Sequence, residues 1–263
     1  MTSTTMFPDG DLTRRDALLR TGRLARLLAA ASLPVTLGVA TRRAHAQGGV
    51  PEELVDVLNF ALTLERLEDE FYKAGLAAGG LNLGDARAVF EQISAHETAH
   101  VTLLTTLLGE AAAPAPTFDF TGGGAFGNVL SNPGTFITLA QGFEDLGVRA
   151  YKGQLAALQR QAALLTAALR IHSVEARHAA MVRRLSQSAA TKPWVTGNAS
   201  IADLQPVYEG EEVTTQLGVD VAQFGNADAA TEAFDEPLTR EQVEAFIEPF
   251  VIPAEEPPPE EET

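Results

Sequence analysis

The sequence predicts an all-α fold: a four-helix bundle of two helical hairpins joined by a long crossover, with a C-terminal extension. Three observations lead to this prediction. Apolar residues recur at helical spacing in four Ala/Leu-rich stretches. A Pro/Gly-rich segment at residues 110–133 separates the first two stretches from the last two. The halves also form a weak repeat, because Glu65 and Glu144 each precede a Tyr-Lys pair by seven residues.

The first hairpin is predicted from the residues that begin and end its two helices. A helix is expected over residues 51–77, and the Gly-rich residues 79–84 predict the turn that follows it. Asp85 is expected to cap the second helix, which runs to about Leu108. Gly109 is the residue type that commonly ends a helix.

The second hairpin has no Gly or Pro at its turn. Its first helix is expected to start near Pro133 and its second to end near Leu185. If Glu144 and Glu175 lie at one depth in the bundle, the chain must turn near the midpoint between them, at residues 159–160. We therefore predict a helix break there.

Two Glu-x-x-His motifs lie in the second and fourth helical stretches, and about 31 residues before each motif stands another glutamate. Residues three apart on a helix share a face, so each motif presents a carboxylate and an imidazole to one point. One such motif is typical of a solvated helix face. Two motifs with matching upstream glutamates form the ligand set of a two-metal carboxylate site. The candidate metal ligands are Glu65, Glu97, His100, Glu144, Glu175 and His178.

The charge of this set favours two divalent metal ions. Four glutamates and two neutral imidazoles carry a formal charge of −4, and unpaired charges buried in a bundle are costly. Oxygen and nitrogen donors suit iron or manganese, with zinc also permitted. By the usual geometry of such sites, Glu97 and Glu175 bridge the metals, Glu65 and Glu144 are terminal ligands, and each histidine binds one metal.

Several neighbouring acidic residues compete with the chosen ligands. Glu68 lies one turn after Glu65, but it aligns with Gly147 in the second half of the repeat, which favours Glu65. Asp69 and Asp145 are expected to be exposed.

Four further side chains flank the motifs. Tyr72 and Tyr151 follow the two upstream glutamates by two turns on the same face. Long helical side chains lean toward the N-terminus, so each hydroxyl is expected at the edge of the site, either donating to a ligand carboxylate or as a half-buried core tyrosine. His96 and His172 are not expected to be ligands; each is expected either to support the site from outside or to lie at the surface.

Residues 1–46 resemble a twin-arginine export signal. Arg14 and Arg15 precede an uncharged run over residues 27–41, and Ala46 closes an A-x-A cleavage site. An uncleaved membrane anchor is the alternative, but the run has only 15 residues and contains Pro34. We therefore expect cleavage, no stable membrane insertion afterwards, and a periplasmic or extracellular location.

Composition excludes several classes of partner and chemistry. The whole chain has a net charge of −16, and the residues after the basic leader carry −20. Nucleic acids and anionic membranes require clustered Lys and Arg, so neither is an expected partner. The chain has no cysteine, which excludes thiol chemistry and iron–sulfur clusters. The oligomeric state is left open, with a dimer among the options.

The C-terminal part divides into two segments after a bundle assigned to residues 51–189. Residues 190–253 are expected to form an extension that packs on the bundle. Within it, Thr239 and Gln242 predict a capping box that opens a short helix to about Ile247. Residues 254–263 are Pro/Glu-rich and are expected to be disordered.

The segments that carry these residues resemble the ferritin-like superfamily, and within it an exported branch related to desiccation-related proteins. The resemblance lies in residues 58–72, Glu97-x-x-His100, Glu144, residues 174–178 and residues 234–239, and it covers roughly residues 51–250. It implies a metal-dependent redox role under oxidative or desiccation stress, with oxygen or peroxide as co-substrate. The superfamily includes iron stores, peroxidases, manganese catalases and oxygenases, so the resemblance does not define the reaction.

Two functions therefore follow from the sequence. The first is a di-metal oxidoreductase that removes peroxide or oxidises ferrous iron. The second is a non-catalytic protective protein of the cell envelope, whose metal site is structural or vestigial. The acidic, Pro-rich tail and the long extension favour the second.

Overall fold

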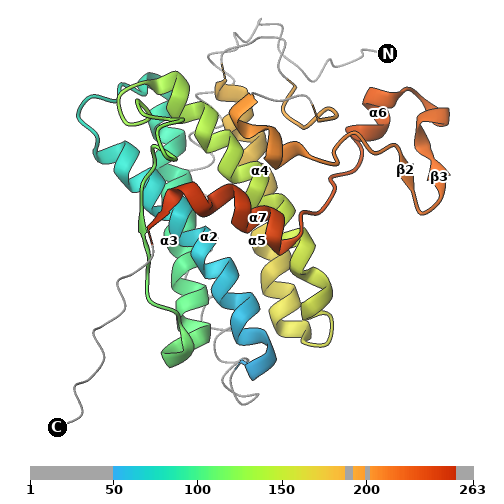
Figure 1. Cartoon of the computed structure of the whole chain (residues 1–263), viewed down its shortest axis with the longest axis horizontal. Coiled ribbons are helices and arrows are strands. Elements are labelled where there is room, and N and C mark those ends of the chain that lie inside the picture. Colours follow the sequence, from blue (N-terminus) through green and yellow to red (C-terminus); the bar gives the residue numbers. More distant parts are fainter. Residues whose placement is uncertain (1–49, 187–191, 199–201, 253–263) are drawn as a thin grey trace, which may run out of the picture.

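The computed structural model describes residues 50–186, 192–198 and 202–252 and contains the predicted four-helix bundle (Figure 1). Its long helices are α2 (Glu52–Ala77), α3 (Arg87–Leu108), α4 (Pro133–Leu158) and α5 (Ala162–Leu185). They pack chiefly as the pairs α2·α3 and α4·α5. None of the described helices is long and apolar enough to cross a bilayer. The predicted leader, residues 1–46, and the predicted tail, residues 254–263, lie outside the described residues.

The start of α4 and the turn of the second hairpin follow the expectations from the sequence, whereas the start of α3 does not. Asn132 caps α4 by accepting hydrogen bonds from the backbone N–H groups of the first helical turn. The predicted break in the second hairpin is confirmed, because α4 ends at Leu158 and α5 begins at Ala162. The expected cap of α3 is wrong: Asp85 lies inside a 3-10 turn, Gly84–Ala86, and no side chain caps the helix that follows.

Two apolar clusters fill the bundle on either side of a buried acidic layer. One contains a group of aromatic rings, in which Phe71 stacks on Phe136 with ring centroids 4.5 Å apart. The other is built from leucines such as Leu58 and Leu164. Along α2, Glu65 lies between Leu58 of one cluster and Phe71 of the other, so the glutamates are enclosed by apolar side chains.

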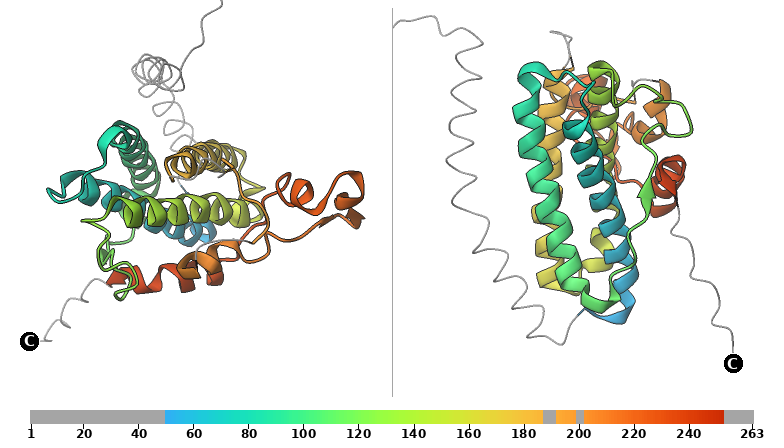
Figure 2. Two further views of the ribbon diagram at one scale, coloured as in Figure 1. Left: turned by 90° about the horizontal axis from the view of Figure 1, so that it is seen from above. Right: turned by 90° about the vertical axis from the view of Figure 1, so that its left-hand side faces the viewer.

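The crossover between the hairpins runs along the length of the bundle and pairs with the end of the extension (Figure 1). Strand β1 (Thr117–Phe118) is antiparallel to β4 (Val251–Ile252). Figure 2 shows α7 (Arg240–Ile247) on the same side as this crossover. The capping box predicted at Thr239 is confirmed, because Thr239 and Gln242 exchange backbone-to-side-chain hydrogen bonds.

The rest of the extension consists of short elements between α5 and α7. A small hairpin and a short helix project beyond the bundle (Figure 1). The elements are the 3-10 helix Ala202–Tyr208, strands β2 (Thr215–Gln216) and β3 (Val219–Asp220), the 3-10 helix Val221–Phe224 and helix α6 (Ala227–Thr231). After α7, the 3-10 turn Glu248–Phe250 leads into β4.

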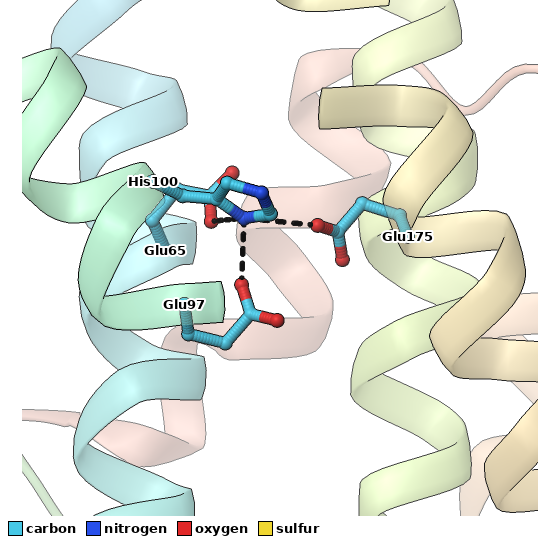
Figure 3. Close-up of side chains that lie close together, drawn as sticks. All are labelled: Glu65, Glu97, His100 and Glu175. Atoms are coloured by element: carbon cyan, nitrogen blue, oxygen red, sulfur yellow. Dashed lines mark hydrogen bonds and ion pairs between the residues drawn. The ribbon is translucent and has the colours of Figure 1, made fainter. Parts of the chain in front are cut away.

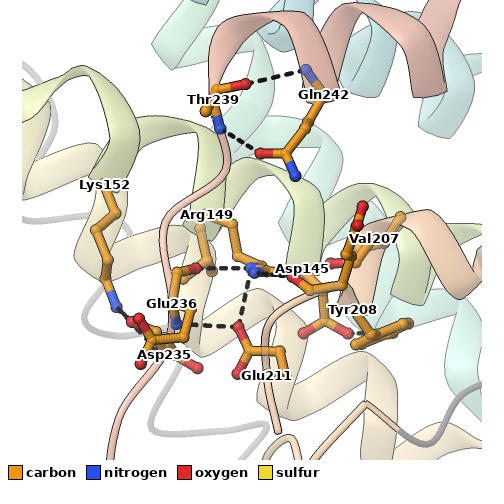
Figure 4. Close-up of polar contacts among 12 residues, drawn as sticks. Asp145, Arg149, Lys152, Val207, Tyr208, Glu211, Asp235, Glu236, Thr239 and Gln242 are labelled. Carbon is orange, nitrogen blue, oxygen red and sulfur yellow. Dashed lines mark hydrogen bonds and ion pairs between the residues drawn. The ribbon is translucent and has the colours of Figure 1, made fainter. Parts of the chain in front are cut away.

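A buried arginine attaches the extension to α4 (Figure 4). The side chain of Arg149 is 2% exposed and donates to three backbone carbonyls of the extension, those of Val207, Glu209 and Glu236. Its Nε also lies 2.9 Å from the carboxylate of Glu211. Removing one partner of a buried ion pair costs about 3–5 kcal/mol, so this contact holds the extension firmly in place.

The backbones of α4 and the extension also approach each other closely. The N–H of Leu238 donates to the carbonyl of Arg149 at 3.3 Å. A Cβ atom on Gly153 would lie 2.1 Å from the carbonyl oxygen of Leu238. No side chain can occupy that space, so position 153 requires glycine.

Two aspartates expected to be exposed are buried instead. Asp145 is 5% exposed, accepts a 2.6 Å hydrogen bond from the hydroxyl of Tyr208 and pairs with Arg183. Asp69 is 4% exposed and accepts a 2.6 Å hydrogen bond from Thr98. Tyr208, Arg183 and Thr98 come from other elements, and the helical pattern around each aspartate contains no sign of them. Asp69 also pairs with Lys73, one turn later on α2, at 2.6 Å.

Candidate metal centre

The structure brings all six candidate ligands to one level inside the bundle. Each of the four main helices contributes, since the two motifs lie on α3 and α5 and the upstream glutamates lie on α2 and α4. The four glutamates are 0% exposed, whereas His178 is 4% and His100 9% exposed. The hairpins therefore carry side chains far apart in the sequence into one enclosed site.

The six residues form two overlapping groups, in each of which one donor atom per residue lies within 4.8 Å of the others. Glu97 and Glu175 belong to both groups, as expected of residues that bridge two ions. The first group is Glu65, Glu97, His100 and Glu175, and the second is Glu97, Glu144, Glu175 and His178.

Both imidazoles face the carboxylates through Nδ1. Nδ1 of His100 lies 3.0 Å from Glu65, 2.9 Å from Glu97 and 3.3 Å from Glu175 (Figure 3). Nδ1 of His178 lies 2.8 Å from Oε1 of Glu97 and 3.3 Å from Oε2 of Glu144. Each glutamate that belongs to one group only thus approaches the imidazole of that group.

The second group contains donor atoms that have no hydrogen-bond partner among the described residues. They are Oε1 of Glu97, Oε2 of Glu144, both oxygens of Glu175 and Nδ1 of His178. These atoms are close together without hydrogen-bond geometry, so their lone pairs converge on shared space. An unsatisfied buried group costs about 1–3 kcal/mol. Cations between these atoms would remove that cost, so the donor set fits divalent metal ions.

Two tyrosines orient the glutamates that belong to a single group. Tyr72 on α2 donates to Oε1 of Glu144 on α4, and Tyr151 on α4 donates to Oε1 of Glu65 on α2. In each case the other oxygen, Oε2, faces a histidine of the centre. Burial, followed by the adjacent glutamate, raises the pKa of both tyrosines, so the hydroxyls remain protonated donors.

The electrostatics of the metal-free centre keep protons in it. Burial and then the charge of Glu97 raise the pKa of Glu175 well above its usual value. Burial opposes charging of His100 and His178, but the facing carboxylates outweigh it and raise both pKa values. Burial likewise opposes ionisation of Glu97, but contacts with both histidines lower its pKa. Metal ions would have to displace these protons.

Glu68 lies at the margin of the centre, outside both four-residue groups. It is 3% exposed, and burial followed by the charge of Glu175 raises its pKa. A Cβ on Gly147 would lie 3.1 Å from carboxylate oxygens of both Glu68 and Glu175. The absence of a side chain at position 147 therefore leaves the space that these carboxylates use.

His96 contacts the centre from outside, which is one of the two roles that the sequence left open for the histidines flanking the motifs. Its Nδ1 lies 2.9 Å from Nε2 of His178, and the two rings are nearly parallel, with centroids 5.2 Å apart. Burial and then the neighbouring His178 lower its pKa to about 4, which keeps it neutral. His172, the histidine that precedes the motif on α5, instead contacts the carbonyl of Val148. Only the packing of α3 against α5 distinguishes the two.

A four-helix bundle enclosing two overlapping carboxylate–histidine groups defines a class of helical proteins that can hold metal ions in the core. The family model for the ferritin-like domain matches residues 53–188, more than half of the chain. The chain therefore belongs to the ferritin-like family, and the resemblance seen in the sequence is confirmed at this level. A search of curated proteins finds no match. Membership of an exported, desiccation-related branch remains a prediction.

Proposed function

We propose that this protein holds two divalent iron or manganese ions and uses them in a redox reaction with oxygen or peroxide. The reaction is either the removal of peroxide or the oxidation of ferrous iron. The observation that carries the proposal is the buried set of unpartnered donor atoms, which belongs to two groups that share Glu97 and Glu175. Two bound redox metals would supply paired electron exchange with a small oxidant.

The composition of each group favours iron or manganese. Each group offers three carboxylates and one imidazole, a hard, oxygen-rich set with one nitrogen donor. The chain has no cysteine, so no thiolate biases the centre toward copper or zinc. Zinc would fill the same positions without redox activity.

The chain's own residues have separate tasks in this proposal. Glu97 and Glu175 join the two metal positions, and Tyr72 and Tyr151 orient the glutamates that belong to one position only. The apolar clusters on either side exclude bulk water, which strengthens the electrostatic interactions in the centre.

The proposal includes export through the leader at residues 1–46 and a role in oxidative or desiccation stress outside the cytoplasm. The support is the twin-arginine pattern of the sequence. Export in the folded state would let the cytoplasm load the metal before release. Cell fractionation of a double variant, Arg14→Lys with Arg15→Lys, tests this part, and unchanged export of the variant would contradict it.

Metal analysis and an absorption spectrum of protein exported by its own host test the main proposal. We expect two iron or manganese ions per chain and turnover of peroxide or of ferrous iron with oxygen. Glu97→Ala and His178→Ala should lose metal and turnover together. Glu70→Ala is the matched control, because the side chain of Glu70 is 57% exposed.

The outcomes separate the two functions that the sequence allows. Two bound metals without any turnover would refute the redox reaction and leave a structural metal site in a protective envelope protein. A chain that binds no metal would refute both the redox reaction and the metal centre.

A further inference from the structure

The two metal positions differ in what supports their histidines from outside. Nε2 of His178 lies 2.9 Å from Nδ1 of His96, and Nε2 of His96 lies 2.8 Å from the side-chain amide nitrogen of Gln92. Within the described residues, the hydrogen bonds of His100 all involve Nδ1. The repeat places Val174 at the position that matches His96, and valine cannot accept a hydrogen bond. Among the described residues, a histidine supported from outside by a series of hydrogen bonds is therefore found at the metal position of His178 and not at that of His100.

This series of hydrogen bonds determines which nitrogen of His178 is free to bind a metal ion. A neutral imidazole carries one N–H, and the other nitrogen is the acceptor or metal ligand. When Nδ1 of His178 carries no proton, the N–H of this imidazole is at Nε2 and donates to Nδ1 of His96. His96 then carries its own proton on Nε2, and the side-chain amide of Gln92, turned over so that its oxygen rather than its nitrogen faces His96, accepts it. Every donor in the series has an acceptor in this arrangement.

The nearly parallel orientation of the two rings adds a geometric constraint. The planes of His96 and His178 are 9° apart, so a rotation of the His178 ring would break both the contact and the hydrogen bond. Nδ1 of His178 thereby stays directed at Glu97 and Glu144. His100, without such a partner, keeps more freedom in its ring orientation.

We propose that His96 is a positioning residue that makes the second metal position, built by Glu97, Glu144, Glu175 and His178, the tighter of the two. The inference rests on the metal centre of the proposed function and adds an order of loading: the second position fills first. Outer partners of metal-binding histidines typically contribute about 10–100-fold in metal affinity.

The test uses Co²⁺ binding to the full chain in two backgrounds that each leave one position. Glu65→Ala removes a ligand of the first position only, and Glu144→Ala removes a ligand of the second only. His96→Phe keeps an aromatic ring but removes the acceptor. His96→Asn places an oxygen near the former Nδ1 and removes the ring. His172→Phe is the matched control, because His172 is half-buried and contacts a backbone carbonyl instead of the centre.

We expect His96→Phe to weaken Co²⁺ binding about 10–100-fold in the Glu65→Ala background and to leave it unchanged in the Glu144→Ala background. His96→Asn should restore most of the affinity, which a purely packing role of the ring would not allow. His172→Phe should change neither affinity.

Three results would overturn the inference: equal weakening in both backgrounds, no weakening in either, or failure of His96→Asn to restore binding. If the unmodified chain binds two Co²⁺ ions with equal affinity, the order of loading is refuted while the proposed metal centre stands. If it binds none, the metal centre itself is refuted.

Discussion

Replacing Glu175 with methionine tests whether the acidic centre destabilises the protein when no metal is bound. Glu175 is 0% exposed, and neither of its carboxylate oxygens has a hydrogen-bond partner among the described residues. Methionine has a similar length and no charge, and it adapts to irregular space. We therefore expect the metal-free variant to be more stable than the metal-free parent.

The size of the effect follows from the two unsatisfied oxygens. Each costs about 1–3 kcal/mol when buried without a partner, and exchanging buried ionic groups for apolar ones of similar volume gains up to about 4 kcal/mol. We expect a gain of about 2–4 kcal/mol in the free energy of unfolding. For a protein of this size that corresponds to a rise in Tm of roughly 4–16 °C.

Thermal unfolding followed by circular dichroism, with chelator and with excess Mn²⁺, measures the stability of the protein without metal and the stabilisation that metal binding adds. Metal at about 100 times its Kd should stabilise the parent by about 2.7 kcal/mol for each site. The variant should gain little, because Glu175 belongs to both groups. Glu70→Met, at an exposed site on α2, should behave like the parent. A metal-free Glu175→Met protein that melts below the parent would refute the reasoning.

Three further predictions concern pH, the extension and the tyrosines. The pKa values of Glu175 and His178 are raised in the folded metal-free chain, so the folded state is more stable when both groups are protonated and loses stability as the pH rises. The Tm measured in chelator should fall between about pH 5 and pH 8 while the increase caused by Mn²⁺ grows, and a flat profile in chelator would count against this. Arg149→Met should lower the free energy of unfolding by about 3–5 kcal/mol in urea titrations, and a loss below about 1 kcal/mol would mean that the extension is held by other contacts. Tyr72→Phe should weaken metal binding at the position of Glu144 about 10–100-fold by calorimetry, and unchanged affinity would show that its hydroxyl does not orient that carboxylate.

Periodicity and the internal repeat were enough to predict the bundle and its second turn. The break expected at residues 159–160 was located from Glu144 and Glu175 alone, and α4 and α5 are separated there by residues 159–161. This works because an α-helix advances by a constant rise per residue. Ligands at one depth therefore place the turn of their hairpin halfway between them.

Contacts between distant elements lay beyond the sequence pattern. The sequence pattern predicts that Asp69 and Asp145 are surface residues, yet each is buried with a partner on another element. His96 and His172 each precede a motif and received the same expectation from the sequence. The packing of α3 against α5 places His96 beside His178, whereas His172 contacts a backbone carbonyl. A hydrogen bond between segments that lie far apart leaves no local signal in either segment.

The sequence by itself determined that two Glu-x-x-His motifs and two upstream glutamates would share helix faces, because side chains three residues apart on a helix point the same way. Only the tertiary structure decided which tyrosine reaches which glutamate, why Gly147 stands opposite Glu68, and that Arg149 is buried under the extension. The physical reason is that helical geometry is local, whereas burial and orientation depend on how complete helices pack against one another.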